Sequence, residues 1–254
     1  MTSTPDTAAA VTVVIPCFNE EAALPPLLAG LAAMRAGGPA RGWHFIFVDD
    51  GSTDGTFSTL LRAACNDSRV EVFRHPENLG LGAALRTGFA HCISPYVCTT
   101  GVSSVYPPER LPQLLAALAG GAAIATPAGL GGNGNQSSSG AAATALSRVL
   151  ARSYNRFLGH DWQTCSCLFR AYRREVLERI RFIADGALAP AEILGRARLA
   201  GYQVEEVAMQ LGTPAATPQP SRVPFTIAHA RLLTRMALTT AVQQLWQLGR
   251  EWRS

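Results

Sequence analysis

The chain contains no lysine, and each of its 22 basic residues is an arginine. We attribute this to codon usage rather than to a phosphate-binding design, although guanidinium groups do bind phosphate in a bidentate manner. Charged residues make up only 16% of the 254, and the net charge is +4. This mild balance permits an anionic ligand or an anionic membrane surface without indicating either. We expect no nucleic-acid partner.

Long apolar runs and metal-binding cysteine patterns are also missing. No stretch reaches the roughly 18 apolar residues that a membrane-spanning helix needs. The six cysteines show no paired C-x-x-C spacing, which argues against a zinc site. Residues 1–10 are small and polar, without a basic start or an apolar core, so we expect a disordered N-terminus and no signal peptide. Free thiols then favour a cytoplasmic protein.

What the sequence does contain is a short apolar run, residues 45–48, that ends in two carboxylates. Aromatic and β-branched residues in such a run are typical of a buried strand. Asp49, Asp50 and a glycine end it, and the following Ser-Thr-Asp is a helix N-cap signature. A second apolar run, residues 11–16, leads into Cys-Phe-Asn-Glu. Ligands of open α/β sheets bind beyond the carboxyl ends of the strands, so we predict a nucleotide site where these two strands end.

Strand-like and helical patterns alternate along the chain, which predicts a mostly parallel sheet covered by helices. The expected strands are 11–16, 45–48, 70–73, 96–100, 122–126 and 203–207. The expected helices are 20–36, 54–64, 77–92, 111–118, 141–158 and 190–200. Residues 129–140 are rich in glycine and serine, and are either a plain linker or a lid over the site.

Four ordered motifs resemble one family. The segments 13–20 and 48–56 resemble family 2 glycosyltransferases of the GT-A fold, and within it the dolichol- or polyprenyl-phosphate mannosyltransferases. Segments 78–84 and 169–174 fit the same family. The resemblance implies a GT-A-like α/β domain over residues 11–223, followed by a helical extension over 224–254.

The resemblance also implies an inverting transfer of a sugar from UDP or GDP to a polyprenyl phosphate or a small-molecule acceptor. The positions matching the family's nucleotide contacts are Pro16, Phe18, Glu20, Asp49, Asp50 and Gly82. Arg170 and Arg222 are the candidate cations for the leaving group. Glu192 resembles the family's glutamate near the acceptor; it is either a general base or a residue that favours the helix N-terminus. For Asp54 we favour a helix-capping role.

One departure from the family concerns the metal. The family holds Mg²⁺ or Mn²⁺ with an Asp-x-Asp motif, often followed by Gln, and these positions are Gly101, Ser103 and Val105 here. Hard divalent cations prefer carboxylate oxygens. The family's arginine near residues 125–128 is also missing. We therefore expect no tightly bound metal, and two functions stay open: sugar transfer without the usual metal, or a protein that binds nucleotide as a partner subunit or repurposed enzyme.

The C-terminal residues 225–252 form a basic amphipathic pattern that contains Trp246 and Trp252. Such a helix can lie on the inner face of a membrane. It can equally pack on its own domain or on a second subunit. The sequence leaves these alternatives open.

Overall fold

The computed structural model describes residues 10–37, 40–129, 156, 167–210, 231–232 and 234–235. Their strands form one sheet in the order β3-β2-β1-β4-β6-β5-β7. The strands are β1 (Val11–Cys17), β2 (His44–Asp49), β3 (Val70–Arg74), β4 (Tyr96–Thr99), β5 (Ile124–Gly129), β6 (Arg170–Arg173) and β7 (Val204–Met209). The helices are α1 (Leu24–Gly37), α2 (Thr56–Asn66), α3 (Leu81–Ala90), α4 (Leu111–Ala119), α6 (Arg174–Arg179) and α7 (Ala189–Leu199), with a 3₁₀ turn at Pro108–Arg110.

The mostly parallel sheet confirms the predicted fold class. Strands β1 to β4 run parallel to their neighbours, and β5 runs parallel to β7. The exception is β6, which pairs antiparallel with both β4 and β5. Strand β6 could not be predicted from the sequence, because its four residues, Arg-Ala-Tyr-Arg, are too few and too charged at both ends to show an apolar run.

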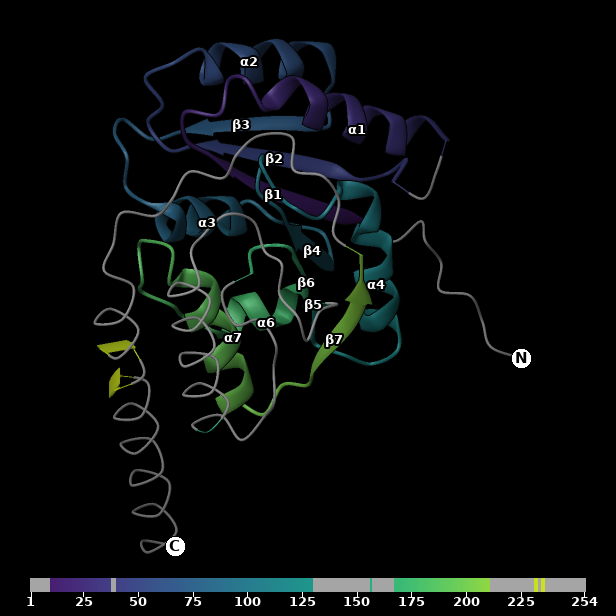
Figure 1. Ribbon diagram of the computed structural model, residues 1–254, viewed down its shortest axis with the longest axis vertical. Helices are drawn as coiled ribbons and strands as arrows, with labels where there is room; N and C mark the ends of the chain where they lie inside the picture. The colour runs from purple at the N-terminus through teal and green to yellow at the C-terminus, as the bar shows by residue number, and fades with distance from the viewer. Residues whose placement is uncertain are drawn as a thin grey trace, which may run out of the picture.

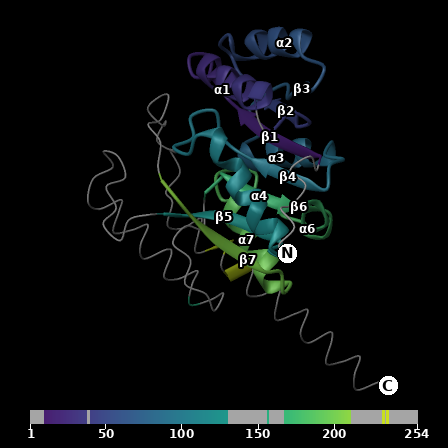
Figure 2. The same cartoon turned by 90° about the vertical axis from the view of Figure 1, so that its right-hand side faces the viewer.

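Helices cover both faces of the sheet (Figure 1). Apolar side chains of α1, α2 and α4 pack on one face, and those of α3, α6 and α7 pack on the other. Figure 2 shows the same layers from the side, with α1 and α4 on the near face of the sheet. Alternate residues of β1 serve the two cores: Val13 and Ile15 belong to one and Val14 to the other. This period of two is what a strand buried on both faces requires.

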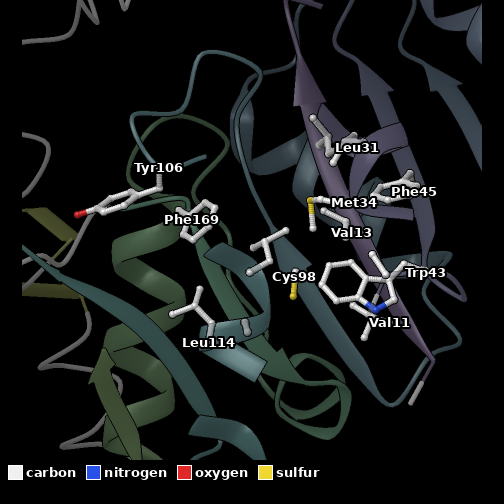
Figure 3. Close-up of a cluster of buried hydrophobic side chains, with 14 of the residues drawn as sticks. Val11, Val13, Leu31, Met34, Trp43, Phe45, Cys98, Tyr106, Leu114 and Phe169 are labelled. Carbon is white, nitrogen blue, oxygen red and sulfur yellow. The ribbon is translucent and has the colours of Figure 1, made fainter. Parts of the chain in front are cut away.

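The core beneath α1 and α4 reaches the loop that follows β4 (Figure 3). Met34 of α1 packs beside Trp43 and Val13, and all three are buried. At the other end of this core, the rings of Tyr106 and Phe169 lie 5.3 Å apart. This contact joins the loop after β4 to the residue before β6, so it helps to fix the edge of the sheet where the site was predicted.

Helices α1 and α3 each begin four residues later than their patterns predicted, at the carboxyl edge of the sheet. Helix α1 begins at Leu24, because residues 21–23 form a turn whose amides at Ala23 and Leu24 donate to the Glu20 carbonyl. Helix α3 begins at Leu81, because Gly80 adopts a φ of +95°, which a helix cannot include. Each delay leaves a short loop between strand and helix.

Apart from Arg156, which is helical, the expected helix 141–158 lies outside the described residues, as does most of the tail 225–252. Of the tail, Leu232 is described; it is buried and belongs to the core beneath α3 and α7. No helix among the described residues has the length and apolar character to cross a membrane.

Candidate functional site

The ends of β1 and β2 lie side by side, as predicted. Cys17 pairs with Asp49 in the parallel register. The amide of Asp50 donates to the Cys17 carbonyl at 2.8 Å. Burial raises the pKa of the Cys17 thiol well above its ordinary value, so this cysteine stays protonated and acts as a core residue. Because β1 and β2 end in register, the two loops that follow them begin side by side at the carboxyl edge of the sheet.

Hydrogen bonds tie the two loops to each other. The amide of Asn19 donates to Ser52 Oγ at 2.9 Å, and the amide of Thr53 donates to Asn19 Oδ1 at 2.9 Å. The amide of Glu20 donates to Thr56 Oγ1 at 2.8 Å. Asn19 has a φ of +53°, a conformation that asparagine tolerates better than most residues. Much of the polar Ser-Thr-Asp-Gly-Thr stretch thus builds the loops and is not left to contact a ligand.

Asp54 belongs to the same set of loop contacts. Its Oδ1 accepts from the amide of Thr56, the first residue of α2, at 3.0 Å. Its Oδ2 accepts from the amide of Glu21 at 3.2 Å. Asp54 thus accepts from the first amide of α2, as a helix-capping role predicts, although the N-cap position itself is Gly55.

Asp49 is different, because one of its buried oxygens is left without a hydrogen bond. Its side chain is fully buried at the end of β2, and Oδ1 accepts from the amide of Ser52 at 3.2 Å. Oδ2 lies 3.2 Å from Arg74 Nε, within ion-pair distance. No N–H or O–H of the described residues meets Oδ2 in hydrogen-bond geometry. A buried carboxylate oxygen in this state can accept from a ligand.

Arg74 is a residue of the site that the sequence analysis missed. It ends β3 and pairs in register with Asp49. Its Nη2 donates to the Ser52 carbonyl at 3.2 Å, and its guanidinium carbon lies 4.4 Å from the centre of the Phe57 ring. The side chain is 47% exposed, so it reaches both Asp49 and solvent. The sequence feature that could have indicated this role is a basic residue at the carboxyl end of the strand that follows β2 along the chain.

Asp50 has protein partners on both oxygens. Oδ1 lies 2.7 Å from His75 Nδ1 and accepts from the amide of Leu79 at 3.0 Å. Oδ2 accepts from the amide of Gly80 at 2.8 Å. His75 is buried, and its Nε2 lies 2.8 Å from Thr87 Oγ1 of α3. These contacts give Asp50 a structural role in holding the turn before α3; a nucleotide contact from Asp50 stays a prediction.

Glu20 faces the loop that follows β4. Ser103 Oγ donates to Glu20 Oε2 at 2.6 Å. Burial raises the pKa of Glu20, the hydrogen bond from Ser103 lowers it, and the charge of Asp54 raises it further. The net direction is upward. Phe18, two residues earlier, is 40% exposed and available to stack on a planar ring. Pro16 lies within β1.

The residues at the positions that resemble the family's metal ligands bring no carboxylate of their own. Ser103 donates a hydrogen bond to Glu20, and the side chains of Gly101 and Val105 have no oxygen, nitrogen or sulfur to offer a cation. Gly101 instead lines a pocket of about 190 Å³ together with Leu27 and Tyr106. Within the described part of the chain, no three His, Cys, Asp or Glu side chains come together as a metal site would require.

The remaining predicted residues take up different places. Arg170 is fully buried; its Nε donates to Thr126 Oγ1 at 3.2 Å and its Nη1 to the Pro190 carbonyl. Gly82 is buried against the 184–185 backbone, so its lack of a side chain has a packing reason. Glu192 is fully buried at the start of α7. Arg222 lies outside the described residues.

The mostly parallel sheet flanked by helices matches the fold of GT-A glycosyltransferases. One solved structure with this fold is glucosyl-3-phosphoglycerate synthase from Mycobacterium tuberculosis with Mn²⁺, UDP and glucosyl-3-phosphoglycerate. It matches with a TM-score of 0.67 and 20% identity over 92% of this chain and 82% of that chain. A mannosyltransferase from Pyrobaculum calidifontis with GDP-Man and Mn²⁺ matches with a TM-score of 0.64 and 20% identity, over 95% and 67% of the two chains. At these identities the likeness shows the fold alone.

The sequence places the chain more closely. The model of glycosyl transferase family 2 matches residues 12–181, well over half of the chain, and the chain belongs to this family. An undecaprenyl-phosphate 4-deoxy-4-formamido-L-arabinose transferase of Aeromonas hydrophila is 33% identical over 171 residues, which is 66% of this chain and 50% of the relative. A Salmonella paratyphi A transferase of the same description is 28% identical over 170 residues, with the same coverage of both chains. The chain spans about half the length of these relatives.

Proposed function

We propose that the protein transfers a sugar from a UDP- or GDP-sugar by inverting chemistry. The observation that carries this proposal is Asp49 Oδ2 at the carboxyl edge of the sheet, a buried carboxylate oxygen that has an ion pair with Arg74 but no hydrogen bond from the described residues. A ring N–H of the base or a ribose hydroxyl supplies the hydrogen bond that this oxygen lacks. We also propose that Phe18 and Glu20, on the adjoining loop, contact the same nucleoside.

In the proposed reaction, an acceptor oxygen attacks the anomeric carbon of the sugar. The bond from that carbon to the diphosphate oxygen breaks, and the nucleoside diphosphate leaves with the bonding electrons. The developing negative charge needs a cation. Gly101, Ser103 and Val105 do not supply a metal site, and the described contacts of Arg170 turn its guanidinium to Thr126 and Pro190. We therefore propose Arg222 as the main cation for the leaving group, with transfer independent of a tightly bound metal.

A polyprenyl phosphate is the acceptor that the relatives favour, since those compared are named as undecaprenyl-phosphate transferases. A small-molecule acceptor is the alternative. A solved structure of the same fold holds glucosyl-3-phosphoglycerate. Synthetic polyprenyl phosphate and 3-phosphoglycerate, offered with the same radiolabelled donor, separate the two classes.

The test of the proposal is calorimetric titration with UDP-glucose, GDP-mannose and the corresponding nucleoside diphosphates, each in EDTA and in Mn²⁺. We expect either the UDP compounds or the GDP compounds to bind in EDTA. Asp49→Asn should weaken their affinity at least tenfold, because a hydrogen bond to a charged group is worth about 1.5–3 kcal/mol. Asp67→Asn is the matched control: Asp67 precedes β3 at the opposite edge of the sheet and pairs with Arg35. Binding that requires Mn²⁺, or an affinity that is unchanged in Asp49→Asn, would contradict the proposal.

A second candidate function is binding without transfer, as a partner subunit or a repurposed enzyme. The residues at the family's metal positions favour it, because a site without its usual cations is poorly suited to expel a diphosphate. A protein that binds one nucleotide sugar tightly but releases no nucleoside diphosphate with either acceptor class would have this second function.

A further inference from the structure

Glu192 has no free oxygen with which to take a proton. Its side chain is fully buried at the start of α7. Oε2 accepts from the amides of Ile183 and Ala184 at 3.1 and 2.8 Å, and Oε1 accepts from Arg196 Nε at 2.7 Å. A general base must reach the acceptor hydroxyl directly or through one water. Glu192 instead holds two consecutive backbone amides of the segment 183–186.

The segment 183–186 lies against the first turn of α3. The Asp185 carbonyl accepts from the amide of Gly82, and the Ala184 carbonyl accepts from Arg86 Nη1 at 3.3 Å. The Asp185 carboxylate forms an ion pair with Arg86. A Cβ on Gly82 would lie 1.8 Å from the Ala184 oxygen, and one on Gly80 would lie 2.4 Å from the Asp185 oxygen. This close fit means that a shift of the segment must move the turn before α3.

The turn before α3 is itself held by Asp50, at the end of β2. The amides of Leu79 and Gly80 donate to the two oxygens of Asp50, and Asp50 directly follows Asp49. Two buried carboxylates thus each hold a pair of consecutive amides, Asp50 at one end and Glu192 at the other. Asp50 holds the turn 79–82, Glu192 holds the segment 183–186, and the turn and the segment contact each other.

From this geometry we propose that Glu192 is a positioning residue and not the general base. It holds the segment 183–186, this segment holds the turn 79–82, and the turn fixes the end of β2 at the candidate nucleotide site. The kinetic part of this inference rests on the proposed function; the structural part does not. The role needs an oxygen that accepts two amides; the negative charge strengthens these bonds and the contact with Arg196 but is not needed to take a proton.

The experiment compares Glu192→Gln with Glu192→Ala in the full chain. Glutamine keeps an oxygen for the amides of Ile183 and Ala184, whereas alanine removes both acceptors. Matched controls are Glu178→Gln and Glu178→Ala, because Glu178 also pairs with an arginine four residues away but is 58% exposed. The readouts are hydrogen exchange of peptides covering 79–82 and 183–186, nucleotide affinity, and the pH profile of kcat/KM.

We expect Glu192→Ala to speed exchange in both segments at least about tenfold and to lower nucleotide affinity, because buried amides without partners favour local opening. Glu192→Gln should restore the protection of both segments. Its kcat/KM should stay within about threefold of wild type with the same pH profile, whereas loss of a general base costs about 10²- to 10⁴-fold. Both Glu178 variants should match wild type in every readout.

Two results would overturn the inference. One is a Glu192→Gln variant with intact protection that loses turnover at least a hundredfold together with the acidic limb of its pH profile. The other is unchanged exchange at 79–82 in Glu192→Ala. If the alanine variant does not fold, Glu192→Gln decides alone. A wild-type protein that binds no nucleotide sugar would count against the proposed function, while the exchange comparison would still decide the role of Glu192.

Discussion

Arg74 Nε lies 3.2 Å from Asp49 Oδ2, and this pair joins the ends of β3 and β2. Asp49 is fully buried while Arg74 is half-exposed, so the guanidinium contacts both solvent and the oxygen proposed to bind the nucleoside. The fixed planar fork of Arg74 also reaches the Ser52 carbonyl. A lysine at this position could not make both contacts in the same geometry.

The first prediction follows from this pair. Arg74→Gln should weaken nucleotide binding about tenfold, because the buried carboxylate loses the cation that orients and neutralises it. Arg74→Lys should recover only part of the affinity. Calorimetry on both variants measures the effect, with Arg62→Gln on the exposed face of α2 as the control. Wild-type affinity in a folded Arg74→Gln variant would separate Arg74 from the site.

The second prediction concerns the pH dependence set by Glu20 and Ser103. Burial holds the pKa of Glu20 above its ordinary value, and the hydrogen bond from Ser103 partly offsets this rise. Ser103→Ala should therefore raise the pKa of Glu20 further. If the nucleoside needs an ionised Glu20, affinity in Ser103→Ala should fall off at a higher pH than in wild type as the solution is acidified.

The same shift affects folding stability, with a defined sign. A carboxyl group whose pKa is higher in the folded than in the unfolded state stabilises the fold when protonated. This contribution is lost as pH rises from the unfolded pKa through the folded pKa of Glu20. Denaturant titrations at several pH values measure it. The control is a double-mutant cycle. In a Glu20→Gln variant, which has no carboxyl group to titrate, Ser103→Ala should change neither the pH dependence of nucleotide affinity nor that of folding stability.

The third prediction concerns the chain of contacts Asp50–His75–Thr87. His75→Ala should destabilise the fold by about 1–3 kcal/mol, because it leaves the buried carboxylate of Asp50 and the partly buried hydroxyl of Thr87 without this partner. Thr87→Val should cost less, because Thr87 is only partly buried. The non-additivity of the two changes measures the coupling. Strictly additive effects would show that His75 does not link β2 to α3.

The fourth prediction separates packing from ligand contact at Gly82. Gly82→Ala should destabilise the fold by about 1–3 kcal/mol or more, because the added methyl meets the Ala184 carbonyl. Gly186→Ala is the control, since a Cβ there has no atom within 4 Å. Thermal unfolding of the two variants gives the comparison. A Gly82→Ala variant that is as stable as wild type but binds no nucleotide would restore Gly82 as a direct contact.

The fifth prediction concerns the basic tail, residues 225–252. If the acceptor is a polyprenyl phosphate, the protein should sediment with anionic vesicles and be released at high salt, because basic contacts to lipid headgroups are screened. The competing expectation is that the tail packs on its own domain, because Leu232 is buried in the core beneath α3 and α7. Recovery in the supernatant, with and without vesicles, would leave packing on the domain or on a second copy as the role of the tail.

The sequence alone determined the mostly parallel sheet, the family, and the edge where β1 and β2 end, because apolar runs and the residues that end them are local signals. The roles within that edge depended on tertiary structure. Asp49 and Asp50 are adjacent in sequence, yet Asp49 has one oxygen that is ion-paired but not hydrogen-bonded within the described residues, whereas Asp50 is held by His75 and two amides. Arg74, His75 and Glu192 acquire their roles from partners on other strands and helices. Motif spacing cannot show such contacts, because it records neighbours along the chain and not across the fold.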